Sequence, residues 1–118
     1  MELKNKALFK ESCFVGGKWI DSDSGEKIKV DNPANNEIIG EVPKCSTSET
    51  TKAIKEAQDA FPNWRDKTAK ERSIILQKWA RLIEQNVDDL ARIMTLEQGK
   101  PLAEAKGEIL MGVTYIDF

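Results

Sequence analysis

The first 45 residues alternate short apolar runs with turn-forming residues. Residues 14–19, 26–30 and 38–42 have the alternating or compact apolar pattern of β-strands. Clusters of Gly, Asp and Asn-Pro separate these runs, as expected at turns. The pattern predicts a β-meander, and the pair Gly16-Gly17 within its first strand is expected to form a tight turn or bulge.

From Ser46 onward the apolar positions recur every three or four residues, which is the spacing of amphipathic helices. Ser46 and Glu49 match a capping box, so a first helix is expected to begin there and to stop at Pro62. Thr68 and Glu71 form a second capping box, which predicts the start of a second helix.

Two further helices are predicted after these. Asn86, Asp88 and Asp89 are expected to start the third helix, because acidic side chains stabilise the positive end of the helix dipole. Gly99 is its expected left-handed terminator, and Pro101 occupies a first-turn position of the fourth helix. The apolar stripes of the four helices are centred on Ile54, Trp79, Ile93 and Ile109.

The fourth stripe is still running at Ile116, and no terminating residue precedes Phe118. We therefore expect a chain truncated in the middle of a helix. The sequence predicts an α+β fragment in which 1–45 is an N-terminal extension with β-strands. Residues 46–118 then form the helical part of a larger domain.

Composition narrows the possible functions. The 118 residues include 18 Lys and Arg against 20 Asp and Glu, a net charge of −2, which argues against broad nucleic-acid binding. No apolar run approaches the ~20 residues needed to cross a membrane, and the first residues lack a signal-peptide pattern. Cys13 and Cys45 are well separated and are interpreted as free thiols, so a cytoplasmic setting is expected.

Histidine is absent, and this excludes the common Ser-His and Cys-His nucleophile pairs. The pair Gly99-Lys100 is not a phosphate loop, because Met94 and Pro101 occupy two of its required positions. Glu104 and Glu108 share one helical face, where they either remain solvated or line a cleft. The residues alone therefore indicate no self-contained active site.

A resemblance to a known family adds information on function that the spacing of the residues does not give. Residues 95–108, with the sequence TLEQGKPLAEAKGE, resemble the N-terminal segment of the aldehyde dehydrogenase superfamily, and most of all its succinate-semialdehyde dehydrogenases. Residues 15–19, 31–34, 57–64 and 68–72 are similar to that family's motifs in the same order. The resemblance covers about residues 12–118.

The resemblance implies part of a Rossmann-like α/β enzyme that uses NAD or NADP, with residues 46–118 as the helical part of its N-terminal, cofactor-binding domain. In such enzymes a cysteine forms a thiohemiacetal with a small aldehyde, here succinate semialdehyde, which is oxidised to succinate. The motifs for the nucleophile and the cofactor are expected after Phe118, so neither Cys13 nor Cys45 inherits a catalytic role. The fragment alone is expected to be inactive, and the whole enzyme to be a homo-oligomer.

Two site assignments follow from the resemblance alone. Some family members hold a structural Na⁺ or K⁺ at positions that correspond to Val30, Asp31 and Glu97. The fourth helix lines the substrate tunnel in relatives, which makes three of its side chains candidate tunnel residues: Glu104, Glu108 and Met111.

A different class of function remains open on the sequence alone. The four apolar helical stripes are also compatible with a non-enzymatic helical module that binds a protein partner.

Overall fold

The computed structural model describes residues 1–118. Four short strands precede four helices, which confirms the predicted α+β class. The elements in chain order are the 3-10 helix η1 (Lys6–Leu8), β1 (Cys13–Val15), β2 (Lys18–Ile20), β3 (Lys27–Asp31), β4 (Ile38–Pro43), α1 (Thr47–Arg65), α2 (Ala69–Gln85), α3 (Val87–Gln98) and α4 (Leu102–Asp117).

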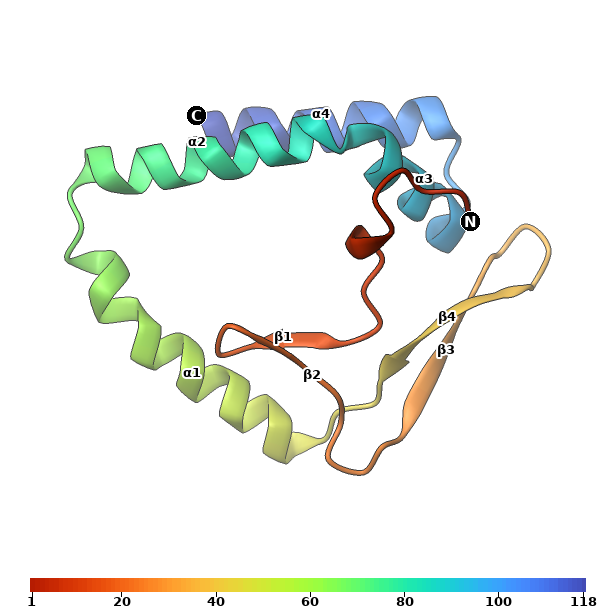
Figure 1. The fold of residues 1–118 in the computed structure, drawn as a ribbon, viewed down its shortest axis with the longest axis horizontal. Coiled ribbons are helices and arrows are strands. Elements are labelled where there is room, and N and C mark those ends of the chain that lie inside the picture. Colours follow the sequence, from red (N-terminus) through yellow and green to blue (C-terminus); the bar gives the residue numbers. More distant parts are fainter.

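The strands form two separate antiparallel hairpins, β1–β2 and β3–β4, which differs from the single meander expected (Figure 1). The expected first strand is itself a hairpin, in which Val15 pairs with Lys18. Gly16 and Gly17 have φ angles of 58° and 76° and form its two-residue turn. Such a turn needs positive φ at both central residues, which glycine adopts without steric cost.

Helix α1 begins at the predicted capping box, where Glu49 and Ser46 satisfy each other's backbone groups. The predicted stop at Pro62 is wrong, because α1 continues to Arg65. A proline lacks its own N–H but keeps its carbonyl, and the carbonyl of Pro62 accepts a hydrogen bond from the N–H of Asp66 at 3.0 Å.

The boundaries of the next helices follow the predicted local signals closely. The capping box of Thr68 and Glu71 starts α2, and Gly99 ends α3 in the left-handed region at φ 81°. Asn86 precedes α3 as expected, but its side chain does not cap that helix. Its Nδ2 instead donates to the carbonyl of Leu82 at 2.8 Å, because Asn86 also ends α2.

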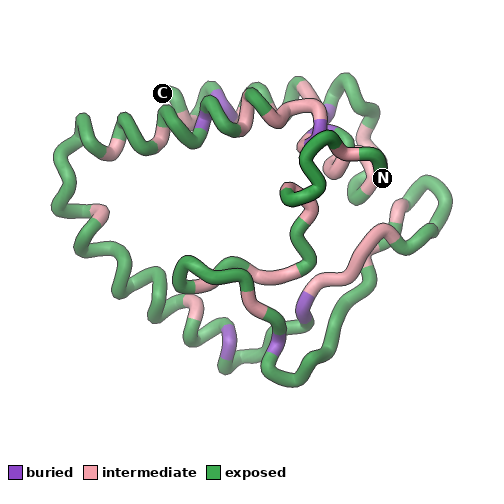
Figure 2. Tube along the Cα trace, in the orientation of Figure 1, coloured by how far each residue is buried: buried purple, intermediate pink, exposed green.

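Helix α4 packs against both α2 and α3, and small side chains occupy the contacts. The fully buried apolar residues are Ala80, Ala91, Ala105 and Val113. Figure 2 shows that such buried positions are few along the chain. Helix α1 lies apart from this helical layer, beside the β1–β2 hairpin (Figure 1).

The chain does not close around a core of its own. Only 8 of its 118 residues are buried, and the radius of gyration is 16.6 Å. A compact domain of this length has a radius of gyration of about 13–14 Å. Large apolar side chains remain exposed on the helices, including Ile54, Trp79 and Tyr115. No helix is both long and apolar enough to span a membrane.

Candidate functional site

The proposed cation ligands lie on two elements that meet. Val30 and Asp31 end strand β3, where a β-bulge interrupts its pairing with β4. Glu97 lies in the last turn of α3, and α3 packs against β3. The fold therefore brings the strand end and the helix end into one region, although they are more than sixty residues apart in the chain.

The contact between these two ends is close. A Cβ atom placed on Gly99 would lie 3.1 Å from Cγ of Pro33, in the turn that follows β3. Because Gly99 has a positive φ and no side chain, the end of α3 can approach this turn. Gly99 thus allows both the left-handed end of α3 and the close packing of α3 on the β3–β4 hairpin.

The donors here fit a hard cation. The ion pairs of the structure involve neither Asp31 nor Glu97, and both residues are exposed. The structure has no group of three or more His, Cys, Asp or Glu side chains placed to hold a metal ion. A cation bound here would therefore need backbone oxygens, such as that of Val30, in addition to carboxylates, and Na⁺ and K⁺ accept such oxygen ligands.

The candidate tunnel residues lie on the exposed side of α4. Glu108 forms an ion pair with Lys100, and this partner raises the pKa of the Lys100 ammonium. Glu104 adds a further negative charge near Lys100, whereas Met111 is 55% exposed. The charge of Glu108 is thus compensated within the chain.

An apolar groove lies between α2, α3 and α4. Its volume is about 530 Å³, and its walls are mainly aliphatic side chains with the ring of Trp79. Glu97 is one of its few polar lining residues. Apart from the Glu97 carboxylate the groove is lined by apolar and uncharged residues, so it is suited to binding an apolar surface.

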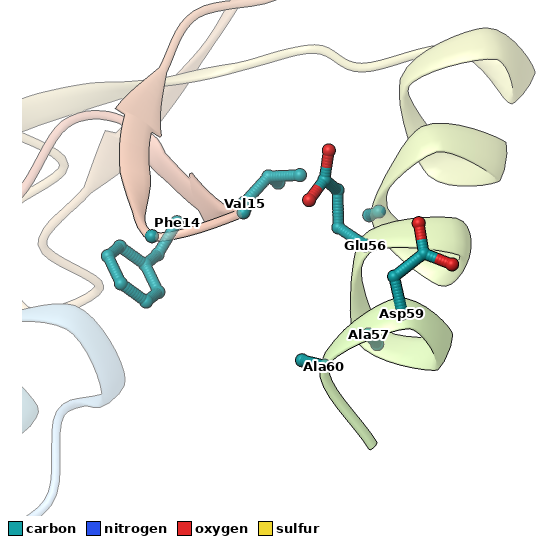
Figure 3. A pocket seen from close by; sticks show the side chains of 9 residues that line it. Phe14, Val15, Glu56, Ala57, Asp59 and Ala60 are labelled. Atoms are coloured by element: carbon teal, nitrogen blue, oxygen red, sulfur yellow. The ribbon is translucent and has the colours of Figure 1, made fainter. Parts of the chain in front are cut away.

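A second cleft, of about 480 Å³, separates the β1–β2 hairpin from α1. Val15 and Glu56 point toward one another across it (Figure 3). The carboxylate of Glu56 comes so close to Gly16 that a Cβ atom there would lie 2.8 Å from Oε2. One wall is therefore acidic, since Asp59 lies beside Glu56 on α1, and the opposite wall is largely apolar.

Two carboxylates hold distant segments together, which local patterns did not predict. Glu49 is buried and accepts a hydrogen bond from the backbone N–H of Asp23 at 2.7 Å, besides closing its capping box. Hydrogen bonds from Ser46 and from this N–H lower the pKa of Glu49 to about 2. The sequence shows the capping box, but no pattern near Asp23 predicts its hydrogen bond to Glu49.

Asp89 is the other carboxylate that holds distant segments together. It lies in the first turn of α3, as expected, and its carboxylate also binds the N-terminal arm. The backbone N–H groups of Lys4 and Asn5 donate to it at 3.0 and 2.8 Å. These hydrogen bonds, led by that of Asn5, lower the pKa of Asp89. Asp88 forms ion pairs with Lys4 and Lys106 instead.

The two cysteines are free thiols, as predicted, but they are not separated in space. Their Sγ atoms lie 4.0 Å apart, although 32 residues separate them in sequence. Cys13 lies in β1, and Cys45 immediately precedes the N-cap of α1. Only the packing of the hairpin beside α1 reveals this pair.

Known proteins resemble the whole chain. It is 53% identical over all 118 residues to a glutarate-semialdehyde dehydrogenase of Pseudomonas putida, covering 25% of that protein. It is 50% identical to an NADP-dependent succinate-semialdehyde dehydrogenase of Escherichia coli, covering 24% of it. A solved succinate-semialdehyde dehydrogenase from Burkholderia pseudomallei superposes with a TM-score of 0.96 at 47% identity, over 99% of this chain and 24% of that one.

The chain thus spans about a quarter of the length of the relatives it matches. This coverage accounts for the open fold, since a quarter of a larger protein need not enclose its own core. Residues 19–118 match the family described as the aldehyde dehydrogenase family, so the resemblance predicted from the motifs is confirmed and the chain belongs to the aldehyde dehydrogenase family.

Proposed function

We propose that this chain is the N-terminal part of an NADP-dependent dehydrogenase that oxidises succinate semialdehyde to succinate. The observation that supports this most is the 50% identity to the Escherichia coli enzyme, which extends over the whole chain. The substrate and the cofactor are those in the name of that relative, and both belong to the complete enzyme.

The chain contributes structure and not chemistry to this reaction. Its two cysteines have no histidine to activate them, and the pKa of the Cys45 thiol is raised by desolvation and by its neighbour Cys13. A thiol with a raised pKa is a poor nucleophile at neutral pH. The nucleophilic cysteine, the glutamate base and the oxyanion-stabilising asparagine are accordingly expected after residue 118, as the family resemblance implies.

Glutarate semialdehyde is the second candidate substrate. The relative from Pseudomonas putida that carries this name is 53% identical to the chain. The two substrates differ by one methylene group, and a pocket discriminates such pairs by only about 10–200-fold. Side chains outside this quarter of the enzyme decide between them.

Expressing the complete reading frame that encodes this chain tests the proposal. We expect NADPH formation from succinate semialdehyde, with a higher kcat/KM than from glutarate semialdehyde. The 118-residue chain is the matched control and is expected to form no NADPH. A reading frame that stops at residue 118, or a longer protein that oxidises neither semialdehyde, would contradict the proposal and favour the non-enzymatic module.

We also propose that Val30, Asp31 and Glu97 help to hold a structural Na⁺ or K⁺. The meeting of β3 with α3 and the two unpaired carboxylates support this. Thermal unfolding of the complete enzyme in potassium and in choline chloride at equal ionic strength tests the site. The Tm advantage in potassium should disappear in Glu97→Gln and persist in Glu104→Gln, and a loss in neither would refute the assignment.

The complete enzyme is proposed to be a cytoplasmic homo-oligomer. The apolar surface that this chain leaves uncovered supports an assembly, and the reduced cysteines suit a reducing compartment. Light scattering of the complete enzyme tests its subunit number, and fluorescence microscopy of a tagged form tests its location.

A further inference from the structure

We propose that Cys13 and Cys45 form a reversible intramolecular disulfide, which fastens the β1–β2 hairpin to the start of α1. Their sulfur atoms lie 4.0 Å apart and are already in thiol–thiol contact. The chain contains no other cysteine, so no competing intramolecular pairing exists. This site is independent of the dehydrogenase chemistry proposed above.

The backbone around both cysteines is held in place. The N–H of Asp23, three residues beyond β2, donates to Glu49 in the first turn of α1 at 2.7 Å. On the other side, the N–H of Lys44 donates to the carbonyl of Glu26 at 2.9 Å and fixes the residue before Cys45. A disulfide needs sulfur atoms at about 2.05 Å, so rotation of the two side chains has to close the remaining gap.

The surroundings leave the pair accessible but slow its oxidation. Cys45 is exposed and Cys13 is half-buried, so a small oxidant can reach the pair. Desolvation, the neighbouring thiol of Cys13 and the negative charges of Glu49 and Asp23 raise the pKa of Cys45 and disfavour its thiolate. Exchange begins with a thiolate, so oxidation should accelerate as the pH rises.

The oxidant we assign is a low-molecular-weight disulfide such as glutathione disulfide. One cysteine thiolate attacks a sulfur of the oxidant, forms a mixed disulfide and releases one glutathione thiolate. The second cysteine then attacks the protein-bound sulfur and expels the second glutathione. The two protein thiols lose two electrons and two protons in total, and glutathione disulfide is reduced to two glutathione molecules.

The bond would act on the cleft between the hairpin and α1. Cys13 adjoins Phe14, which lines that cleft, and Cys45 immediately precedes the capping residue of α1. The disulfide would close a loop spanning 32 residues and restrict the unfolded chain, which stabilises the folded state. Oxidation should therefore raise Tm and protect the 13–45 segment from proteolysis.

The test equilibrates the purified protein in mixtures of reduced and oxidised glutathione, blocks free thiols by alkylation and measures the intact mass. We expect the mass of a single polypeptide that lacks two hydrogens, with no alkyl group on Cys13 or Cys45. Trypsin should then release peptides 11–18 and 45–52 joined to each other, and the reductant dithiothreitol should separate them. Thermal unfolding without reductant should show a higher Tm than with it.

Three comparisons make the test decisive. Cys13→Ser and Cys45→Ser should each stop at a mixed disulfide with glutathione. Moving the thiol by combining Cys13→Ser with Phe14→Cys should also prevent closure, because neighbouring side chains within strand β1 point to opposite sides. In guanidinium chloride the yield of closed protein at a given glutathione ratio should fall roughly tenfold, since the fold no longer holds the thiols together.

Other outcomes overturn the proposal. They are a disulfide between two chains, a wild-type protein that stops at the mixed disulfide, and equal closure in the folded and denatured states. The wild-type measurements alone separate these outcomes, so the proposal is testable even if a variant fails to fold.

Discussion

The carboxylate of Glu49 accepts a hydrogen bond at 2.7 Å from the backbone N–H of Asp23, which lies 26 residues earlier. Its other oxygen accepts from the backbone N–H of Ser46 at 2.8 Å. One side chain therefore caps α1 and also holds the loop between β2 and β3. This is a polar connection between the loop after the β1–β2 hairpin and the helical part of the chain.

Replacing Glu49 with Gln should lower Tm by several degrees. The amide keeps one acceptor oxygen but loses the charge and one of the two acceptors, so the N–H of either Asp23 or Ser46 is left without a strong partner. Glu71→Gln is the matched control, because Glu71 bonds only to its own capping residue Thr68 and is exposed. Circular dichroism should show the smaller effect at Glu71, and equal effects would contradict the bridging role of Glu49.

The same side chain should make stability depend on acid pH. The folded state holds the pKa of Glu49 at about 2, below its ordinary value of 4.5. The stabilisation is therefore fully present above about pH 4.5 and is lost as the pH falls toward 2. Urea unfolding across this range should give a shallower pH dependence for Glu49→Gln than for the wild type, and identical slopes would refute the assignment.

Gly99 and Gly107 should respond to alanine in opposite directions. Gly99→Ala combines a left-handed backbone with a Cβ placed 3.1 Å from Pro33, and should cost roughly 1–2 kcal/mol. Gly107 is exposed within α4 with open space around its Cα, so Gly107→Ala should stabilise the chain by about 0.5–1 kcal/mol. Chemical denaturation measures both, and a stabilising Gly99→Ala would exclude the left-handed terminus.

Asp89→Asn should release the N-terminal arm. The single amide oxygen cannot match the carboxylate that accepts from both Lys4 and Asn5, and hydrogen exchange at these two amides should accelerate roughly tenfold or more. Asp88→Asn is the control, since Asp88 forms surface ion pairs that contribute little. Because the pKa of Asp89 is lowered, wild-type protection should also fall as the carboxylate protonates at acid pH.

The chain by itself should self-associate through its uncovered helical face. Trp79 is 55% exposed on the wall of the apolar groove, and uncovered apolar patches drive association. Light scattering should show dimers or larger species, and Trp79→Lys should shift them toward the monomer. Gln77→Glu, on the same helix outside the groove, should leave the distribution unchanged. A strict monomer at high concentration would contradict this prediction.

Local signals predicted the helices well. The capping boxes at Ser46 and Thr68 and the left-handed Gly99 act through hydrogen bonds between residues three or four positions apart, so the sequence displays them directly. The same local reasoning failed at Pro62, because a proline keeps its carbonyl, and that of Pro62 accepts the hydrogen bond from Asp66 that continues the helix. It also merged the Gly16-Gly17 hairpin into one strand, although two glycines between apolar runs are a known hairpin signal.

The sequence likewise predicted only part of the candidate site. Motif order in residues 95–108 was enough to identify the family, and it assigned Asp31 and Glu97 to a cation by resemblance. It could not show that α3 reaches the turn after β3, because that contact joins segments far apart in the chain.

The sequence by itself determined the order and limits of most elements and the family, because caps, turns and motifs act between near neighbours. Only the tertiary structure decided which distant groups meet: Glu49 with Asp23, Asp89 with the N-terminal arm, and Cys13 with Cys45. These contacts span 26 to 85 residues, and no local pattern encodes such a distance. They form because the chain folds back on itself, which depends on the packing of whole elements.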